Sequence, residues 1–141
     1  MTLAIALAII AFAGAFHVWW AIGGRLGYSV SLPQRPDGTP VLPDHLPRWR
    51  PAAGAVALCL AALALLLLAR AGHVRLPVPR DWIRWALLLA GAACVARAIV
   101  PNRYVGFFKT LRSTRWARYD TRFYSPLFLL LGLAILWEAT R

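Results

Sequence analysis

The sequence has few acidic residues. It contains five Asp or Glu against 16 Lys or Arg among 141 residues, which gives a formal net charge of +11. So few carboxylates leave no two inside the hydrophobic segments that could act as an acid–base pair. The basic residues lie between and at the edges of those segments, not along a soluble helix or in a tail. This placement argues against nucleic-acid binding and favours contact with anionic lipid headgroups.

Cysteine is also scarce, and its spacing carries no metal or disulfide signature. Cys59 and Cys94 each lie within a hydrophobic segment, where a free thiol behaves as a small apolar group. His17, His45 and His73 lie on separate elements and lack ligand spacing. The chain has no GxSxG, HExxH or GxxxxGK[ST] motif. We therefore expect no metal and no cofactor.

Hydrophobic residues are abundant and lie in four Ala- and Leu-rich segments. They make up 60% of the chain, whereas soluble domains contain roughly 45–50%. The first segment has no basic residue before it and is long enough to cross a bilayer, so we expect a membrane span and not a signal peptide. The pattern predicts one all-α domain over residues 1–141, an integral membrane four-helix transmembrane bundle. The expected helices are at about 3–22, 52–69, 82–100 and 125–138.

Two of the connecting segments have a distinctive composition. Residues 26–51 contain six prolines, which exclude a regular helix and leave two alternatives: a segment packed over the bundle mouth or a mobile connector. Residues 102–124 are basic and aromatic, as is typical of a headgroup layer. A single amphipathic helix does not fit that segment, whereas two shorter pieces with a break near residues 110–114 do.

Helix-start signals precede the third and fourth predicted spans. Asp81 is placed to cap the N-terminus of the third helix. Ser125 followed by Pro126 predicts the start of the fourth, with Ser as the N-cap and Pro in the first turn. The fourth apolar stretch is then short for a bilayer, so the helix must extend into the flanking residues, tilt little or lie where the bilayer is thinned.

The distribution of positive charge predicts an orientation. The first and third connections carry four and six Lys or Arg, whereas the termini, the second connection and the start of the third span carry five. The positive-inside rule then places the first and third connections in the cytoplasm and both termini outside. An Ala/Leu/Arg-rich composition is compatible with a bacterial inner (cytoplasmic) membrane.

Four polar residues are predicted to meet near one end of the bundle. His17 and Arg97 lie within spans and toward the same side of the membrane, and Asp120 and Tyr124 enter the fourth span from that side. Ionisable residues inside a membrane are candidates for function. Asp120 is the natural counter-ion for Arg97, and His17 could hydrogen-bond to Tyr124. Structural alternatives remain: His17 could link two helices, Arg97 could extend to the headgroups, and Asp120 could cap a helix.

A second group of basic residues is predicted to contact lipid headgroups or phosphate. Each lies in, or beside, one of the two connections expected on the cytoplasmic side. The group consists of Arg25, Arg103, Lys109 and Arg112.

Two strings resemble the signature of a family of small bacterial membrane proteins, domain of unknown function 3995. Residues 17–25, His-Val-Trp-Trp-Ala-Ile-Gly-Gly-Arg, are similar to its His-x-x-Trp-Ala-x-Gly-Gly opening. Residues 114–120 and 124–127 are similar to its closing Thr-x-Phe-Ala-x-x-Asp and Tyr-Ser-Pro-Leu, with Trp116 in place of Phe. The resemblance implies a four-helix membrane protein and no established activity. Its motif positions include His17, Gly23, Gly24, Asp120 and Tyr124.

Three functions are compatible with these features. The first is a lipid- or protein-binding accessory membrane protein, with Arg97 and Arg103 on phosphate and a membrane-protein partner or a second copy as alternative partners. The second is a membrane-embedded enzyme acting on a lipid-like substrate, with His17 as general acid or base. The third is a small proton-coupled transporter that depends on titration of His17.

Overall fold

Four helices in the described part of the chain are long and apolar enough to cross a membrane. The computed structural model describes residues 1–41 and 49–141. The spans are α1 (Thr2–Ala21), α2 (Trp49–Arg70), α3 (Arg80–Ile99) and one continuous helix over Arg115–Thr140. The predicted all-α, four-span membrane architecture is confirmed.

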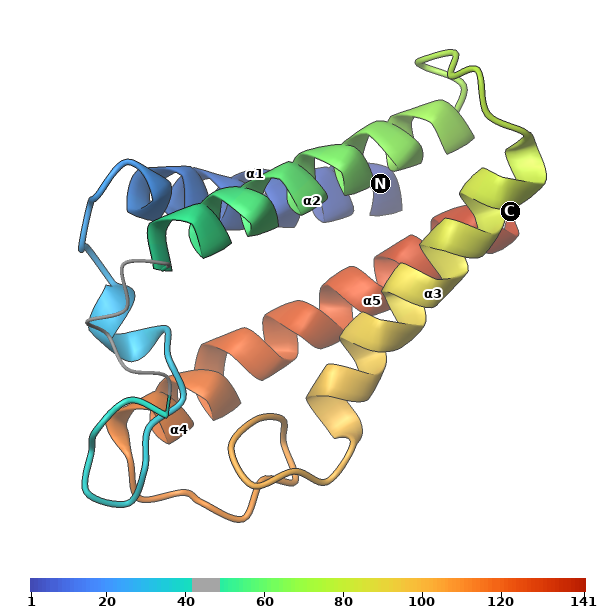
Figure 1. Ribbon diagram of the computed structural model, residues 1–141. Helices are drawn as coiled ribbons and strands as arrows, with labels where there is room; N and C mark the ends of the chain where they lie inside the picture. Colours follow the sequence, from blue (N-terminus) through green and yellow to red (C-terminus); the bar gives the residue numbers. More distant parts are fainter. Residues whose placement is uncertain (42–48) are drawn as a thin grey trace.

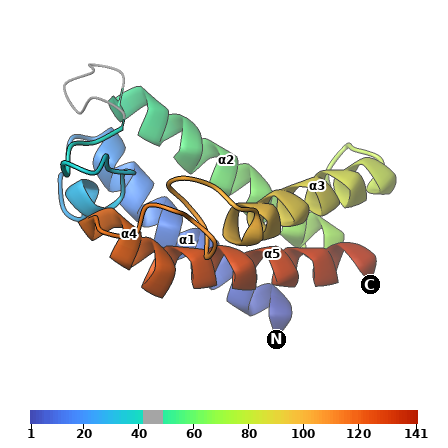
Figure 2. The ribbon, with the colours of Figure 1, turned by 90° about the horizontal axis from the view of Figure 1, so that it is seen from below.

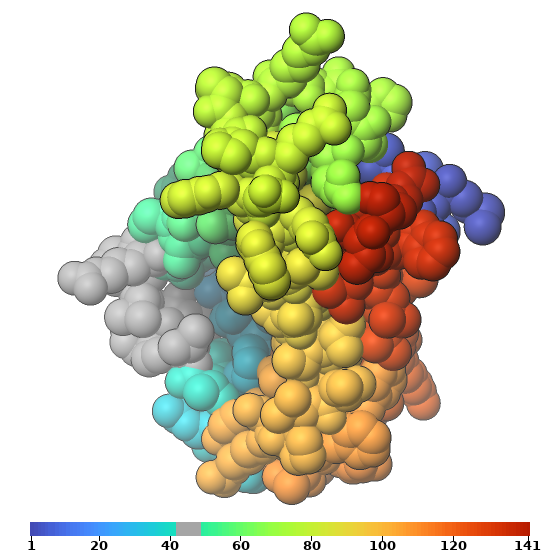
Figure 3. Space-filling model, turned by 90° about the vertical axis from the view of Figure 1, so that its right-hand side faces the viewer, coloured from blue at the N-terminus to red at the C-terminus, as the bar shows by residue number. Residues whose placement is uncertain are grey.

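The helices form two hairpins, α1 with α2 and α3 with the fourth span (Figure 1). Both termini and loop 2 (residues 71–79) lie at one end; the described part of loop 1 (residues 22–41 of 22–48) and loop 3 (residues 100–114) lie at the other (Figures 1 and 3). The apolar core joins the hairpins near the termini and includes Ala6, Ile10, Leu67 and Ile135. The hairpins are therefore packed together at the terminal end and diverge toward the opposite end (Figure 1).

The α3 hairpin is held by a close backbone approach. A Cβ on Gly132 would lie 2.8 Å from the Gly91 carbonyl oxygen and 2.9 Å from the Val95 nitrogen. A Cβ on Gly91 would in turn lie 2.8 Å from Leu136 Cγ. Small residues at a helix crossing allow the tight van der Waals packing that holds membrane helices together.

The fourth span corrects the predicted boundaries. It begins at α4 (Arg115–Tyr119), passes through the π-helical turn η2 (Asp120–Tyr124) and continues as α5 (Ser125–Thr140). Thr114 is the N-cap, because its hydroxyl accepts a hydrogen bond from the Ala117 N–H at 3.1 Å. The prediction that Ser125 caps the helix is therefore wrong, and the short apolar stretch is extended on its N-terminal side, one of the three expected alternatives.

Pro126 does not interrupt this helix, because a wider turn precedes it. Proline lacks an N–H and clashes with the carbonyl of the preceding turn. In η2 the Ser125 N–H donates to the Asp120 carbonyl five residues earlier, in the π-helical pattern. The helix therefore continues through Pro126, although the sequence predicts a helix start at this proline.

The predicted cap of α3 is also wrong by two positions. The helix begins at Arg80 with Pro79 in the N-cap position, and Asp81 lies inside the first turn without a capping hydrogen bond. The Asp81 carboxylate still lies where the helix dipole favours negative charge.

Loop 1 starts with a glycine turn and lies against α4 (Figures 1 and 2). Gly23 has φ +106°, and the Gly23 and Gly24 N–H groups donate to the Trp20 and Trp19 carbonyls, which ends α1 in a Schellman-type cap. The Gln34 side-chain oxygen then accepts from the Trp116 N–H at 3.0 Å. Of the two alternatives for this segment, the described part packs over the bundle end.

Two predicted features of the connections differ in how far the structure describes them. Residues 42–48 of the proline-rich segment, which include His45 and Arg48, lie outside the described residues. In the basic aromatic segment, residues 110–114 separate a helix on their C-terminal side from turns on their N-terminal side. Only the second of the two expected pieces is therefore helical.

Candidate functional site

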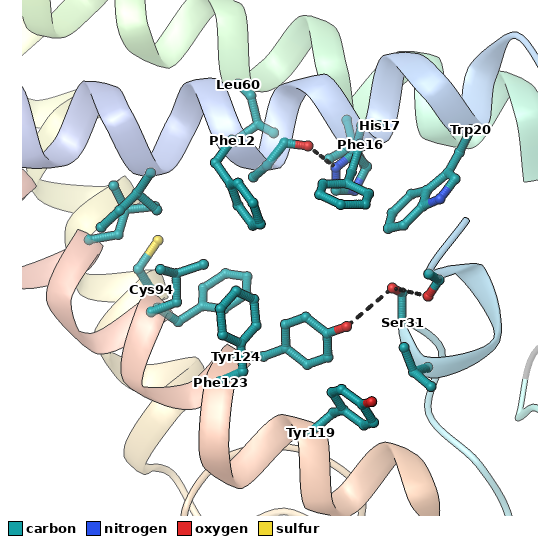
Figure 4. Close-up of a pocket in the computed structure, with 18 of the residues that line it drawn as sticks. Phe12, Phe16, His17, Trp20, Ser31, Leu60, Cys94, Tyr119, Phe123 and Tyr124 are labelled. Atoms are coloured by element: carbon teal, nitrogen blue, oxygen red, sulfur yellow. Dashed lines mark hydrogen bonds between the residues drawn. The ribbon is translucent and has the colours of Figure 1, made fainter. Parts of the chain in front are cut away.

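A pocket of about 900 Å³ lies between the two hairpins, at the end where they diverge (Figure 4). Its walls come from α1, α2, the fourth span and Cys94 of α3, and part of loop 1 lines its mouth. This volume falls in the upper part of the range for small-molecule sites, roughly 300–1,000 Å³. We refer to this cavity as the inter-hairpin pocket.

The walls of the pocket are largely aromatic. Phe12, Phe16 and Trp20 recur every fourth residue, so they project from one face of α1. Their rings form a continuous series, with centroids 5.2 Å apart for the first pair and 5.8 Å apart for the second. Phe123 from the opposite wall approaches Phe12 with a centroid distance of 5.9 Å. These rings offer an apolar surface suited to a hydrocarbon chain.

Polar groups gather where loop 1 meets the pocket. The Tyr124 and Ser31 hydroxyl oxygens lie 3.3 Å apart, and the Tyr124 ring stacks on Trp116 at a centroid distance of 5.2 Å. His17 also lines the pocket, with Nδ1 2.8 Å from the Ala13 carbonyl oxygen. Because a carbonyl only accepts, Nδ1 carries the hydrogen, and the neutral ring keeps a lone pair on Nε2.

Two arginines line the same pocket and were not among the predicted site residues. Arg118 from α4 and Arg122 from η2 are exposed and lie four residues apart. The signal that could have found them is Thr114, since a helix that starts there places residues 118, 119, 122 and 123 on one face. Because Ser125-Pro126 predicts a helix start after both arginines, the sequence did not predict that they share a helix face.

The other polar cluster is a buried ion triad of Arg97, Lys109 and Asp120. The Asp120 side chain is 0% exposed and that of Lys109 is 1% exposed. The Asp120 carboxylate accepts hydrogen bonds from Arg97 at 2.5 Å, Lys109 at 2.9 Å, the Gly106 N–H at 2.9 Å and Ser125 Oγ at 3.0 Å. Four donors occupy the lone-pair sites of a carboxylate, so this group is engaged within the protein.

The triad ties loop 3 to two helices. Lys109 Nζ also donates to the Gly106 carbonyl at 2.8 Å and to Thr121 Oγ1 at 2.7 Å. Arg97 reaches Ser125 Oγ at 3.2 Å and lies 4.4 Å from the Phe128 ring centroid. A buried charge needs such a complete set of partners, because an unpaired one is strongly unfavourable.

The structure thus divides the four residues of the predicted polar site. His17 and Tyr124 line the inter-hairpin pocket, whereas Arg97 and Asp120 belong to the triad. The predicted Arg97–Asp120 ion pair is present, and the alternatives in which Arg97 extends to headgroups or Asp120 caps a helix are wrong. His17 and Tyr124 hydrogen-bond to Ala13 and Ser31, not to each other.

The four basic residues that were predicted to contact headgroups also have different environments in the structure. Arg25 and Arg103 are exposed, and Arg103 lies 5.5 Å from the Tyr104 ring centroid. Arg112 donates to the Lys109 and Phe107 carbonyls. For Lys109 the expectation is corrected, because its ammonium group points into the protein and pairs with Asp120.

A second buried polar cluster lies at the terminal end of the bundle. Glu138 is 1% exposed, accepts a hydrogen bond from Thr2 Oγ1 and pairs with Arg141 at 3.0 Å. Arg70 donates to the Ala139 and Arg141 carbonyls nearby. These contacts join α1, α2 and α5 where the hairpins meet. Within residues 1–41 and 49–141 no group of three His, Cys, Asp or Glu is arranged to hold a metal ion.

Comparison with known proteins identifies the family. The sequence profile of the family described as "protein of unknown function (DUF3995)" matches residues 2–135, so the chain belongs to that family. No curated protein and no solved structure matches it. The family motifs now have physical roles: Gly23 and Gly24 end α1, Asp120 anchors the triad, and Tyr124 lines the pocket.

Proposed function

We propose that this member of the DUF3995 family is a membrane binding or accessory protein that holds the apolar part of a membrane amphiphile in the inter-hairpin pocket. The observation that carries the proposal is the pocket itself, about 900 Å³ in volume with aromatic walls and a polar mouth. An apolar cavity with a few convergent polar groups is the usual form of a ligand site.

The position of the pocket supports a ligand that comes from the bilayer. Its walls are formed by the four spans themselves, including Phe12 and Phe16 of α1 and Leu60 of α2. The cavity therefore falls within the depth of the bilayer, toward the end that carries loops 1 and 3. An amphiphile could enter between the hairpins with its polar group at Ser31 and Tyr124.

A pair of tryptophan substitutions tests the proposal. Ala13 lines the pocket, whereas Ala15 is exposed on the same helix and is absent from the pocket wall. Ala13→Trp fills the cavity, and Ala15→Trp adds the same side chain to the outside. Native mass spectrometry of protein released gently from its own membrane should detect a retained amphiphile in wild type and Ala15→Trp, and none in Ala13→Trp. Equal retention in both variants would overturn the proposal.

His17 supports a second candidate, a membrane-embedded enzyme acting on a lipid-like substrate. Its Nδ1 is hydrogen-bonded to the Ala13 carbonyl, so Nε2 is the basic atom of a ring that lines the pocket. The candidate predicts that His17→Ala loses turnover of the amphiphile identified above and still binds it. Unchanged turnover in that variant would exclude this role.

We further propose that the protein resides in the inner membrane with loops 1 and 3 in the cytoplasm. Leaving out the buried Lys109, loops 1 and 3 and the helix ends that adjoin them carry nine basic residues against five at the opposite end. The positive-inside rule favours that orientation. The pocket mouth then opens toward the cytoplasmic leaflet, where anionic lipid is available.

A further inference from the structure

Two pocket-lining arginines have no protein partner in the described part of the chain. The guanidinium groups of Arg118 and Arg122 form neither a hydrogen bond nor an ion pair with any residue in 1–41 or 49–141. Three other basic residues near this end are engaged within the protein: Arg97 and Lys109 pair with Asp120, and Arg112 donates to backbone carbonyls.

The pocket holds no negative charge that could balance these arginines. None of the described residues that line it is Asp or Glu. Asp120, the only acid in the basic aromatic segment, already accepts four hydrogen bonds inside the triad. Arg118 and Arg122 therefore give the pocket an uncompensated positive charge beside an apolar wall.

We propose that Arg118 and Arg122 bind the anionic headgroup of a membrane lipid whose chain occupies the inter-hairpin pocket. This inference rests on the proposed function and adds the charge class of the ligand. The guanidinium group has a planar set of donors that matches the oxygens of a phosphate. Tyr119 also lines the pocket, whereas the Tyr124 hydroxyl is already hydrogen-bonded to Ser31.

The shape of the site favours a lipid over a free anion. A free phosphate would need only the two arginines and would leave the aromatic cavity beyond them empty. A lipid fills both parts, because its headgroup meets the arginines and its chain buries apolar surface against Phe12, Phe123 and their neighbours.

The test compares two lipids that share the same phosphate and acyl chains and differ in the alcohol esterified to the phosphate, which makes one headgroup anionic and the other zwitterionic. Phosphatidylglycerol and phosphatidylcholine with identical acyl chains are titrated into the full chain in detergent, and bound lipid is counted by native mass spectrometry. Wild type should retain phosphatidylglycerol about tenfold better, because its headgroup has a net negative charge and that of phosphatidylcholine has none. The double variant Arg118→Gln/Arg122→Gln should lose this preference.

A matched control removes two charges from the same end of the molecule. Arg35 and Arg115 are exposed and lie outside the pocket wall. Arg35→Gln/Arg115→Gln should keep the preference for phosphatidylglycerol. Loss of preference in this control would assign it to diffuse surface charge and overturn the inference, as would a preference that survives in Arg118→Gln/Arg122→Gln.

Two further comparisons distinguish failure of the headgroup assignment from failure of the proposed function. Displacement of phosphatidylglycerol by millimolar inorganic phosphate, which supplies no apolar chain, would assign the arginines to a free anion and overturn the inference. Loss of both lipids in Ala13→Trp, with the preference unaffected by the arginine variants, would leave the proposed function intact and remove only the headgroup assignment. Retention of both lipids in Ala13→Trp would overturn the proposed function as well.

Discussion

Asp120 is the residue on which the arrangement of loop 3 depends. Its carboxylate holds two cations from different segments, Arg97 of α3 and Lys109 of loop 3, and the backbone N–H of Gly106. Removing the only anion of a buried cluster leaves two positive charges without compensation. The residue therefore fixes structure near the pocket without lining it.

Asp120→Asn is expected to destabilise the protein strongly. The free energy of unfolding should fall by about 3–5 kcal/mol, the usual effect of breaking a buried ion pair on one side. Denaturant titration in detergent, followed by tryptophan fluorescence, measures the change. Asp81→Asn, which neutralises an exposed acid in α3, is the control and should change stability by less than about 1 kcal/mol.

The double variant Asp120→Asn/Lys109→Met separates charge from shape in this cluster. Removing the buried ammonium together with the carboxylate should recover part of the lost stability, because fewer unpaired charges remain. A double variant that is less stable than Asp120→Asn would contradict the structural role assigned to the triad.

For single residues, the sequence predicted the ion pair of Arg97 with Asp120 but not the burial of Lys109. Asp120 is the only acid in its segment, so charge alone indicated Arg97 as its partner. Nothing in the spacing indicated that Lys109 turns inward, since its burial depends on the path of loop 3 around Gly106, whose φ is +87°. Arg118 and Arg122 were not predicted as site residues because their side-chain directions follow from a helix that starts after Thr114. The sequence predicts a later start, at Ser125-Pro126.

Among the helices, the pairing of α3 with α5 is the tightest contact and fixes one wall of the pocket. Gly91 and Gly132 allow the two backbones to approach so closely that no side chain fits between them. The hairpin of α1 and α2 carries the opposite wall. The distance between the two walls then depends on the packing of the hairpins near the termini and on the contact of loop 1 with α4.

Gly132→Ala is expected to disturb this contact. The added methyl group would meet the backbone of Gly91 and Val95, which cannot move aside as a side chain can, so the free energy of unfolding should fall by about 1–3 kcal/mol. Gly14→Ala is the matched control, because a methyl group at that position would have no neighbour within 4 Å among the described residues. That substitution should leave stability unchanged or raise it by up to about 1 kcal/mol through helix propensity. Thermal unfolding of both variants measures the difference in stability. Equal melting temperatures would contradict the close approach of the α3 and α5 backbones.

Three of the four spans were predicted within three residues at either end, because their apolar runs end at Gly, Pro or Arg. The fourth was misjudged at its start. Ser125-Pro126 has the composition of an N-terminus, and local preference alone favours a break there. The π-turn η2 and the side-chain contacts of Ser125 with Asp120 and Arg97 override that preference. Such tertiary contacts have no signature in local sequence.

In the whole molecule, both termini and loop 2 share one end, as four spans require (Figure 1). Orientation is therefore tested at a single terminus. An alkaline phosphatase fused after Arg141 should be active and a green fluorescent protein fused there should be dark, because the charge distribution favours an external C-terminus. The opposite pattern would reverse the orientation and direct the pocket mouth to the outer leaflet.

The proposed function depends on a lipid chain inside the inter-hairpin pocket, and photo-crosslinking can locate that chain. A phosphatidylglycerol with a diazirine near the end of its acyl chain would be incorporated with the protein into vesicles, irradiated and mapped by peptide mass spectrometry. We expect labels on pocket residues such as Phe12, Phe16 and Leu127, lost in Ala13→Trp and kept in Ala15→Trp. Labelling of the exposed residues Leu58 and Leu89 should persist in every sample. Labels confined to such exposed residues in the wild type would contradict the proposed function and leave the pocket without a lipid.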